Sequence, residues 1–164
     1  MLKRAVAALA VAASLAVPAA AADGPKISLG YAFLRYLEEG GGDAPLGVYL
    51  SGWGAGRGTF ELDIARHRDT DGGAALNTFT VLGGPRAGFG GRSSHPYAHA
   101  LGGLRHDRFA GGSNTSYGGA AGLGIDIGPG GGAGTRLRLG ADFEVFFEEG
   151  ESLKALRLTA GFTF

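Results

Sequence analysis

The 164-residue sequence has 15 Lys and Arg, 15 Asp and Glu, a formal net charge of zero and no cysteine. The missing cysteines exclude a small secreted scaffold held by disulfides, and the lack of a basic excess argues against nucleic acid as a partner. The 33 glycines have no collagen-like period, and glycine at this density would be costly in helices.

The N-terminal residues have the pattern of a secretory signal peptide. A basic start at Lys3 and Arg4 is followed by an apolar run, 5–17, and then by several alanines. The run is shorter than the roughly 20 residues that a membrane-spanning helix needs. We therefore expect residues 1–22 to be removed and residues 23–164 to form one domain. That domain keeps 13 Lys and Arg against 15 Asp and Glu, a formal charge of minus two.

The remaining chain contains eight segments in which apolar and polar residues alternate, the pattern of half-buried strands. Clusters of Gly, Pro, Asp or Ser separate them, and each is near the roughly 9 to 11 residues of a tilted membrane-spanning strand. No amphipathic helix of useful length competes with this interpretation. The predicted strands are 26–37, 46–54, 59–68, 76–87, 96–105, 116–127, 135–147 and 152–164.

The alternation gives each strand one apolar and one polar face. In the third segment, Phe60 and Leu62 point to one side, and Glu61 and Asp63 point to the other. The last two segments repeat the pattern. Extending the same parity to all strands collects five acids and five arginines on the polar face: Glu61, Asp63, Asp126, Asp142, Glu144, Arg86, Arg105, Arg136, Arg138 and Arg157.

Periodicity alone does not decide which face is outside, because a soluble barrel or sandwich buries its apolar face and a membrane barrel exposes it to lipid. Three features favour the membrane: the export signal, an even strand number that allows closure without a free edge, and aromatics near the strand ends. We therefore predict an all-β fold, an eight-stranded antiparallel up-and-down transmembrane β-barrel. The aromatics expected at the interfaces are Tyr31, Phe60, Phe89, Tyr97, Phe147 and Phe162.

The ten polar-face residues are then predicted to form a charge network in the lumen. Unpaired buried charges are expensive, so a balanced set indicates ion pairs that fill and hold the barrel. The alternative is that these residues line a narrow path for ions. Packing is the favoured role, since eight strands leave an interior just wide enough for side chains.

The stretches SLGYAFLRYL, LGGPRAGF, PYAHALGGLRHDRF and GGAAGLGIDI, and the final RLRLGADFEVFFEEGESLKALRLTAGFTF, resemble small bacterial outer-membrane β-barrel proteins of the OmpA/OmpX type. The resemblance implies periplasmic termini, three short periplasmic turns and four outward loops. It also implies an outer-membrane location among lipid and lipopolysaccharide, in a monomer. A C-terminal aromatic in such families is read by the outer-membrane assembly machinery, and Phe164, with Phe162 before it, matches that position. The outward loops would lie near 38–45, 69–75, 106–115 and 148–151.

Neither a catalytic residue nor a metal or cofactor site is predicted. His95 and His99 would share a strand face about 13 Å apart, too far for one metal ion. A lipid-modifying enzyme on such a barrel would need a nucleophile beside a base. Ser93 and Ser94 fall in a predicted periplasmic turn, and Ser116 has no histidine within two residues. A triad assembled across strands stays open at this point.

Acidic residues gather in the predicted outward loops. Loops need charge for solubility, but these side chains suggest a second hypothesis, in which they bind divalent cations shared with lipopolysaccharide phosphates. The residues are Glu38, Glu39, Asp43, Asp69, Asp71, Asp107, Glu148, Glu149 and Glu151.

The sequence thus predicts an integral outer-membrane protein with a structural or surface-interaction role and no enzymatic activity. Three alternatives remain: a narrow channel for ions or small solutes, an outer-membrane lipid-modifying enzyme, and a secreted soluble ligand-binding barrel.

Overall fold

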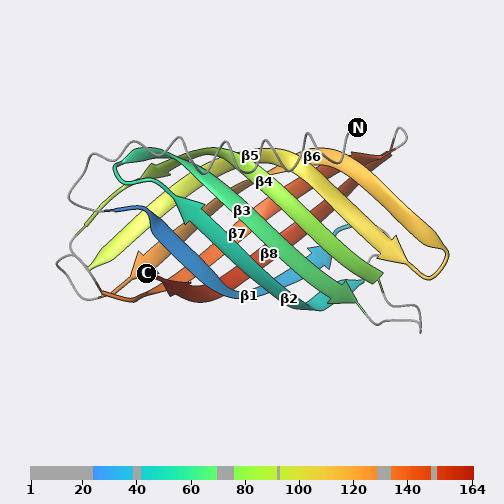
Figure 1. Ribbon diagram of the computed structural model, residues 1–164, viewed down its shortest axis with the longest axis horizontal. Helices are drawn as coiled ribbons and strands as arrows, with labels where there is room; N and C mark the ends of the chain where they lie inside the picture. The colour runs from blue at the N-terminus through green and yellow to red at the C-terminus, as the bar shows by residue number, and fades with distance from the viewer. Residues whose placement is uncertain (1–23, 39–41, 70–75, 92, 129–133, 149–150) are drawn as a thin grey trace.

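The computed structural model describes residues 24–38, 42–69, 76–91, 93–128, 134–148 and 151–164. Eight antiparallel strands form a closed barrel in which each strand pairs with its neighbours in sequence and β8 pairs with β1 (Figure 1). The predicted eight-stranded antiparallel barrel is confirmed; the expected signal peptide lies outside the described residues. The strands are β1 Lys26–Tyr36, β2 Asp43–Trp53, β3 Gly58–Asp69, β4 Leu76–Gly88, β5 Ser94–Phe109, β6 Gly112–Ile127, β7 Arg136–Glu148 and β8 Glu151–Thr163.

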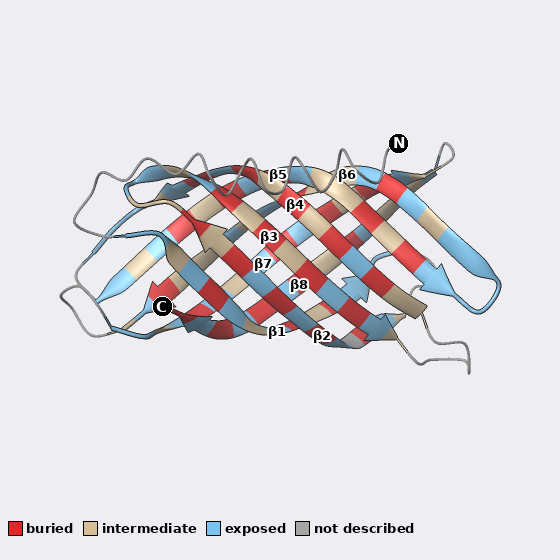
Figure 2. Ribbon diagram, viewed as in Figure 1, coloured by how far each residue is buried: buried red, intermediate tan, exposed pale blue. Residues whose placement is uncertain are grey.

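Buried and exposed residues alternate along the strands (Figure 2), as period-two side-chain geometry requires. In β7, Asp142 and Glu144 are buried, whereas Leu139 and Phe143 are 41% and 45% exposed. The outer face is therefore apolar and the interior is rich in buried polar and charged side chains, the reverse of a soluble barrel. Apolar clusters, such as that of Leu82, Leu101 and Phe146, fill part of the bore. The described residues contain no helix long and apolar enough to cross a membrane.

One end of the barrel, the termini end, carries the start of β1 and the end of β8; the other is called the loop end. At the loop end, β5 and β6 extend further than predicted and pair up to Phe109 and Gly112. The predicted loop 106–115 is wrong, because only 110–111 connect these strands. The sequence of this segment is polar like that of a loop, because strand ends that extend beyond the apolar outer surface can be polar on both faces.

A second correction concerns the start of β2. The strand begins at Asp43, inside the predicted loop 38–45, and its pairing with β1 shifts register between Ala32 and Leu34. Such an irregularity interrupts the alternation that marks a strand in the sequence. The segment therefore lacks a clean period-two signal.

Glycines on the inner face leave room for large interior side chains. A Cβ at Gly122 would overlap Asp142 Oδ1 and lie 2.8 Å from His99 Nε2, and one at Gly124 would overlap the Tyr97 ring. Part of the high glycine content is thus explained by space in a narrow bore. Gly56 has a separate reason, since its φ of 106° in the turn between β2 and β3 favours glycine.

Replacing Gly122 by alanine is expected to destabilise the folded barrel by about 1 to 3 kcal/mol, the usual cost of overpacking a filled interior. Gly102→Ala is the matched control, because a Cβ there points outward and its nearest neighbouring atom would be 3.8 Å away. Urea unfolding of both variants in lipid vesicles measures the difference. Equal stability of the two variants would contradict the tight packing around Gly122.

Candidate functional site in the barrel interior

The centre of the bore holds a group of buried charged side chains, which we call the central network. Its members come from six consecutive strands, β3 to β8, and are at most 8% exposed. Period-two geometry points them inward from each of these six strands. They are Glu61, Asp63, Arg86, His99, Asp126, Arg138, Asp142, Glu144 and Arg157.

Toward the termini end, Glu61 is an acceptor shared by two arginines. Arg138 Nη2 donates to Glu61 Oε1 at 2.8 Å, and Arg86 Nη1 donates to Glu61 Oε2 at 3.2 Å. Arg86 Nη2 also donates to Asp126 Oδ2 at 3.0 Å, and Thr163 Oγ1 donates to Asp126 Oδ1 at 3.1 Å. These contacts compensate the loss of water around both carboxylates.

Further along the bore, His99 joins two carboxylates. Its Nδ1 lies 2.8 Å from Glu61 Oε2, and its Nε2 lies 2.7 Å from Asp142 Oδ1. Because a carboxylate oxygen only accepts hydrogen bonds, this arrangement favours the imidazolium, in which both ring nitrogens donate. Arg157 continues the chain, since its Nη2 donates to Asp142 Oδ2 at 2.8 Å and its Nη1 to Asp63 Oδ1 at 2.6 Å. Opposite charges thus alternate continuously through the centre.

Two aromatic side chains pack against Arg86 and Arg138, the arginines of the central network on the side of the termini end. The Arg86 guanidinium carbon lies 4.1 Å from the centre of the Trp53 ring and 3.6 Å from that of Tyr97. Arg138 contacts the same two rings at 4.5 and 4.4 Å. Such cation–π contacts add to the stability of desolvated arginines. Tyr97 is therefore an interior residue, 3% exposed, and its predicted place at the membrane interface is wrong.

A second interior group lies toward the loop end, and we call it the Arg105 clamp. Arg105 donates from Nε to Asp107 Oδ2 at 2.7 Å and from Nη2 to Asp107 Oδ1 at 3.0 Å. The same Nη2 donates to Tyr36 Oη at 3.0 Å, and Thr78 Oγ1 donates to Asp107. A bidentate pair of this kind fixes the orientation of both side chains. The clamp therefore joins β1, β4 and β5 across the bore.

The structure brings nine of the ten predicted lumen residues into these two groups. Arg136 is the exception: its parity is correct, but it lies at the rim of the termini end in a shallow recess with Lys26 and Phe164. No hydrogen bond or ion pair joins it to either group within the described residues. The parity rule gives the direction of a side chain and does not give its depth along the bore.

Sequence reasoning missed His99 and Asp107 as partners of these arginines. Both share the odd-numbered parity of Arg105 on β5, so extending the alternation along that strand would place them inside. The sequence prediction leaves Asp107 in an outward loop instead, because the predicted strand ends at residue 105. Ser51, which accepts from Arg138 Nη1 at 3.0 Å, was also missed, although it shares the inward parity of Tyr49 on β2.

The side chains of both groups close the bore. Glu61 is fully buried, and Arg105 and Arg157 are each 1% exposed. An open water-filled pore would leave its lining side chains accessible to solvent. The arrangement is that of a packed interior.

The described residues show no assembled catalytic or metal site. No group of three or more His, Asp or Glu side chains among them is placed to hold a metal ion. A hydroxyl does meet a histidine across the hairpin of β5 and β6, where Thr115 Oγ1 lies 2.8 Å from His106 Nδ1. A nucleophile and base also require an orienting group, and no described carboxylate hydrogen-bonds this imidazole.

The six acidic loop residues that the structure describes divide into three sets. Asp107 is buried in the Arg105 clamp and does not belong to an outward rim. Asp43 lies 3.8 Å from Arg35, and Glu38 accepts a hydrogen bond from the Lys154 backbone. Asp69, Glu148 and Glu151 lie at strand ends. The predicted rim positions that fall outside the described residues are Glu39, Asp71 and Glu149.

No family model matches this sequence, and no curated protein matches it. Solved structures do match: Neisserial surface protein A aligns with a TM-score of 0.71 and 17% identity over 86% of this chain and 96% of that chain. Ail, the attachment invasion locus protein of Yersinia pestis, aligns with a TM-score of 0.56 and 19% identity over 87% and 99%. OprG from Pseudomonas aeruginosa aligns with a TM-score of 0.57 and 14% identity over 86% and 95%. At these identities the likeness concerns the fold.

Proposed function

We propose that this chain, which has the fold of the small eight-stranded outer-membrane β-barrels, is an integral protein of the bacterial outer membrane. Its role is structural or in surface interaction, without enzymatic activity. The apolar outer surface carries this proposal. It includes Leu50, Phe60, Leu123, Phe143 and Phe162, which are between 45% and 67% exposed.

The distribution of polarity supports a membrane location over a secreted soluble barrel. A continuous apolar outer surface is unfavourable in water and favourable in lipid. In the described part of the chain, ion pairs of the central network fill the space that a ligand of a soluble barrel would occupy. The network connects six strands across the bore, which supports a structural role for the barrel beneath the loop end.

A role at the surface has additional support from one structural neighbour. Ail has also been solved in complex with the heparin analogue sucrose octasulfate, and in that structure the chain aligns with this one at a TM-score of 0.56. This property belongs to that protein. For the present chain it supports the proposal that the loop end of the barrel contacts other molecules.

Membrane fractionation, followed by electrophoresis of unheated and boiled samples, tests the proposed location. We expect the protein in the outer-membrane fraction, and we expect the unheated form to migrate as a compact species because a closed barrel resists unfolding in detergent. Recovery of the folded protein in the soluble periplasmic fraction would overturn the proposal. Altered lipid A in cells that express the chain would overturn the non-enzymatic role alone.

A narrow channel is the second candidate function, and one observation favours it. Between the central network and the Arg105 clamp, both ring nitrogens of His67 and Thr80 Oγ1 have no hydrogen-bond partner among the described residues. The buried carboxylate of Glu144 lies 3.2 Å from Arg157 Nε. Waters commonly satisfy buried polar groups of this kind. Discrete conductance steps in a planar bilayer would favour the channel over the packed interior.

We also propose that the C-terminal strand is the part recognised during membrane assembly. Its last aromatics support this, because Phe162 and Phe164 are 54% and 58% exposed on the outer face of the barrel. Deletion of Phe164 is expected to lower the amount of protein in the outer membrane more than it lowers the unfolding free energy of the refolded barrel. Normal membrane levels of the truncated protein would contradict this prediction.

A further inference from the structure

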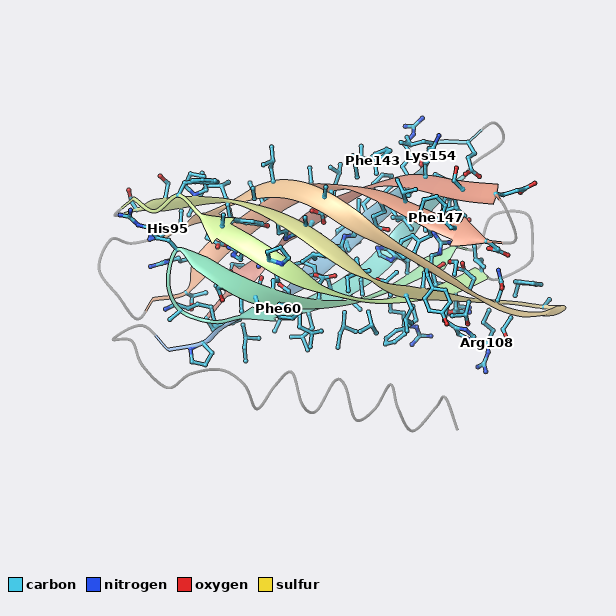
Figure 3. The ribbon with its side chains drawn as sticks, turned by 90° about the horizontal axis from the view of Figure 1, so that it is seen from above. Phe60, His95, Arg108, Phe143, Phe147 and Lys154 are labelled. Carbon is cyan, nitrogen blue, oxygen red and sulfur yellow. The ribbon has the colours of Figure 1, made fainter. Side chains whose placement is uncertain are left out.

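The outer face of the barrel carries basic side chains near the loop end. In Figure 3, Arg108 and Lys154 point outward on opposite sides of that end, away from the end that carries His95. The outward-facing residues described in the strands near the termini end are uncharged. The basic residues that are exposed at the loop end of the outer face are Arg35, Arg66, Arg68, Arg108 and Lys154, and His106 is half-buried among them.

Four of these residues form a compact set on β3 and β5, which we call the basic patch: Arg66, Arg68, His106 and Arg108. Asn77 of β4 is the Cα partner of both Arg68 and Arg108. The next outward row places Arg66 and His106 on the two sides of the same strand. Strand geometry therefore spaces the four residues by about 10 Å across the sheet and about 7 Å along it.

The three arginines of the basic patch carry uncompensated charge in the described part of the chain. Arg66 Nη2 donates to the neutral Asn77 Oδ1 at 3.3 Å, and no described carboxylate forms an ion pair with any of the three. Arg35, on the opposite side of β2, differs because it lies 3.8 Å from Asp43. The patch therefore has several guanidinium N–H groups available to donate hydrogen bonds to a ligand on the outer face.

The surface around the basic patch limits the chemical class of ligand that could bind there. Phe79, 42% exposed, lies between Arg66 and His106 within the patch. Toward the middle of the barrel, the next outward row is apolar and consists of Ile64, Val81, Leu104 and Tyr117, the last of them 61% exposed. A ligand that covers both regions must combine an anionic head with hydrocarbon. Guanidinium groups match the geometry of phosphate oxygens and bind them with two parallel hydrogen bonds. A charged side chain on a lipid-facing surface is tolerated near the interface and costly deeper in the bilayer.

We propose that the basic patch binds the phosphates of a saccharolipid in the outer leaflet, with Arg66, Arg68 and Arg108 donating hydrogen bonds to the phosphate oxygens. The acyl chains of that lipid lie along the apolar surface below the patch. The inference rests on the proposed membrane location and names a partner for it. Here arginines contact phosphate directly, in contrast to the acidic rim and shared cations that the sequence suggested.

The test uses the full mature barrel in phosphatidylcholine nanodiscs, to which lipid A with two phosphates is added. Binding is read from native mass spectrometry and from the shift in thermal unfolding. We compare Arg68→Gln/Arg108→Gln with Arg57→Gln/Arg136→Gln, which removes the same charge at the termini end. Each arginine lost from the patch is expected to weaken binding about fivefold, so the first variant binds about 25-fold more weakly and the control binds like the unmodified protein.

Three comparison ligands separate the sources of the effect. Phosphate-free lipid A, phosphatidylglycerol and inorganic phosphate are each expected to bind at least tenfold more weakly. Equal binding of any of them, or equal binding by the two variants, would overturn the inference while the membrane location stands. If the unmodified barrel does not insert into bilayers at all, the proposed function and this inference both fail.

Discussion

Replacing Arg157 by methionine is expected to lower the unfolding free energy of the barrel by about 3 to 5 kcal/mol, the usual cost of removing one partner from a buried ion pair. Arg157 is 1% exposed and contacts three acids. Without it, Asp63, Asp142 and Glu144 would share the bore without their common cation. Methionine keeps much of the side-chain volume, so the loss of charge is the main change.

Arg136→Met is the matched control for this prediction. It removes the same charge from the inner face of β7 at the exposed rim, away from the central network, and a surface change of this kind is expected to cost no more than about 0.5 kcal/mol. Urea unfolding of the refolded barrels in vesicles measures both variants. If Arg157→Met is as stable as the control, the central network does not hold the barrel together.

Replacing Leu158 by arginine is expected to cost about 2 to 4 kcal/mol, the range for an arginine on the lipid face near the bilayer midplane. Leu158 is 44% exposed and lies midway along β8, opposite Ala141 of β7 and Phe33 of β1. The outer face at this depth is apolar on all three strands. A guanidinium at this position would be surrounded by lipid hydrocarbon and separated from water.

Ser152→Arg provides the control for depth, because Ser152 lies on β8 at the loop end, opposite Phe147 of β7. An arginine near the interface is expected to cost at most about 1 kcal/mol. The same vesicle unfolding assay compares the two variants. Equal costs at the two depths would mean that hydrocarbon does not surround the middle of the barrel, and the proposed membrane location would be wrong.

The alternation along β3, β7 and β8 was sufficient to predict the side-chain directions, because each residue in a strand points opposite to its neighbour. It placed Glu61, Asp142 and Arg157 on one face. Where the alternation was broken or masked, prediction failed: the register shift near Ala32 concealed the start of β2, and polar residues on both faces concealed the extension of β5 to Phe109.

The amino-acid sequence by itself determined the number of strands, their antiparallel order and the polarity of the two faces, since these depend on local periodicity and on turn residues. Which charges meet was decided only by the closed barrel. The contact of Arg157 with Asp63 joins residues 94 positions apart, and that of Arg138 with Glu61 joins residues 77 apart. Strand tilt and register set the depth of each side chain in the bore. That depth places His99 between two carboxylates, leaves Arg136 at the rim, and gathers Arg66, Arg68 and Arg108 on one outer surface.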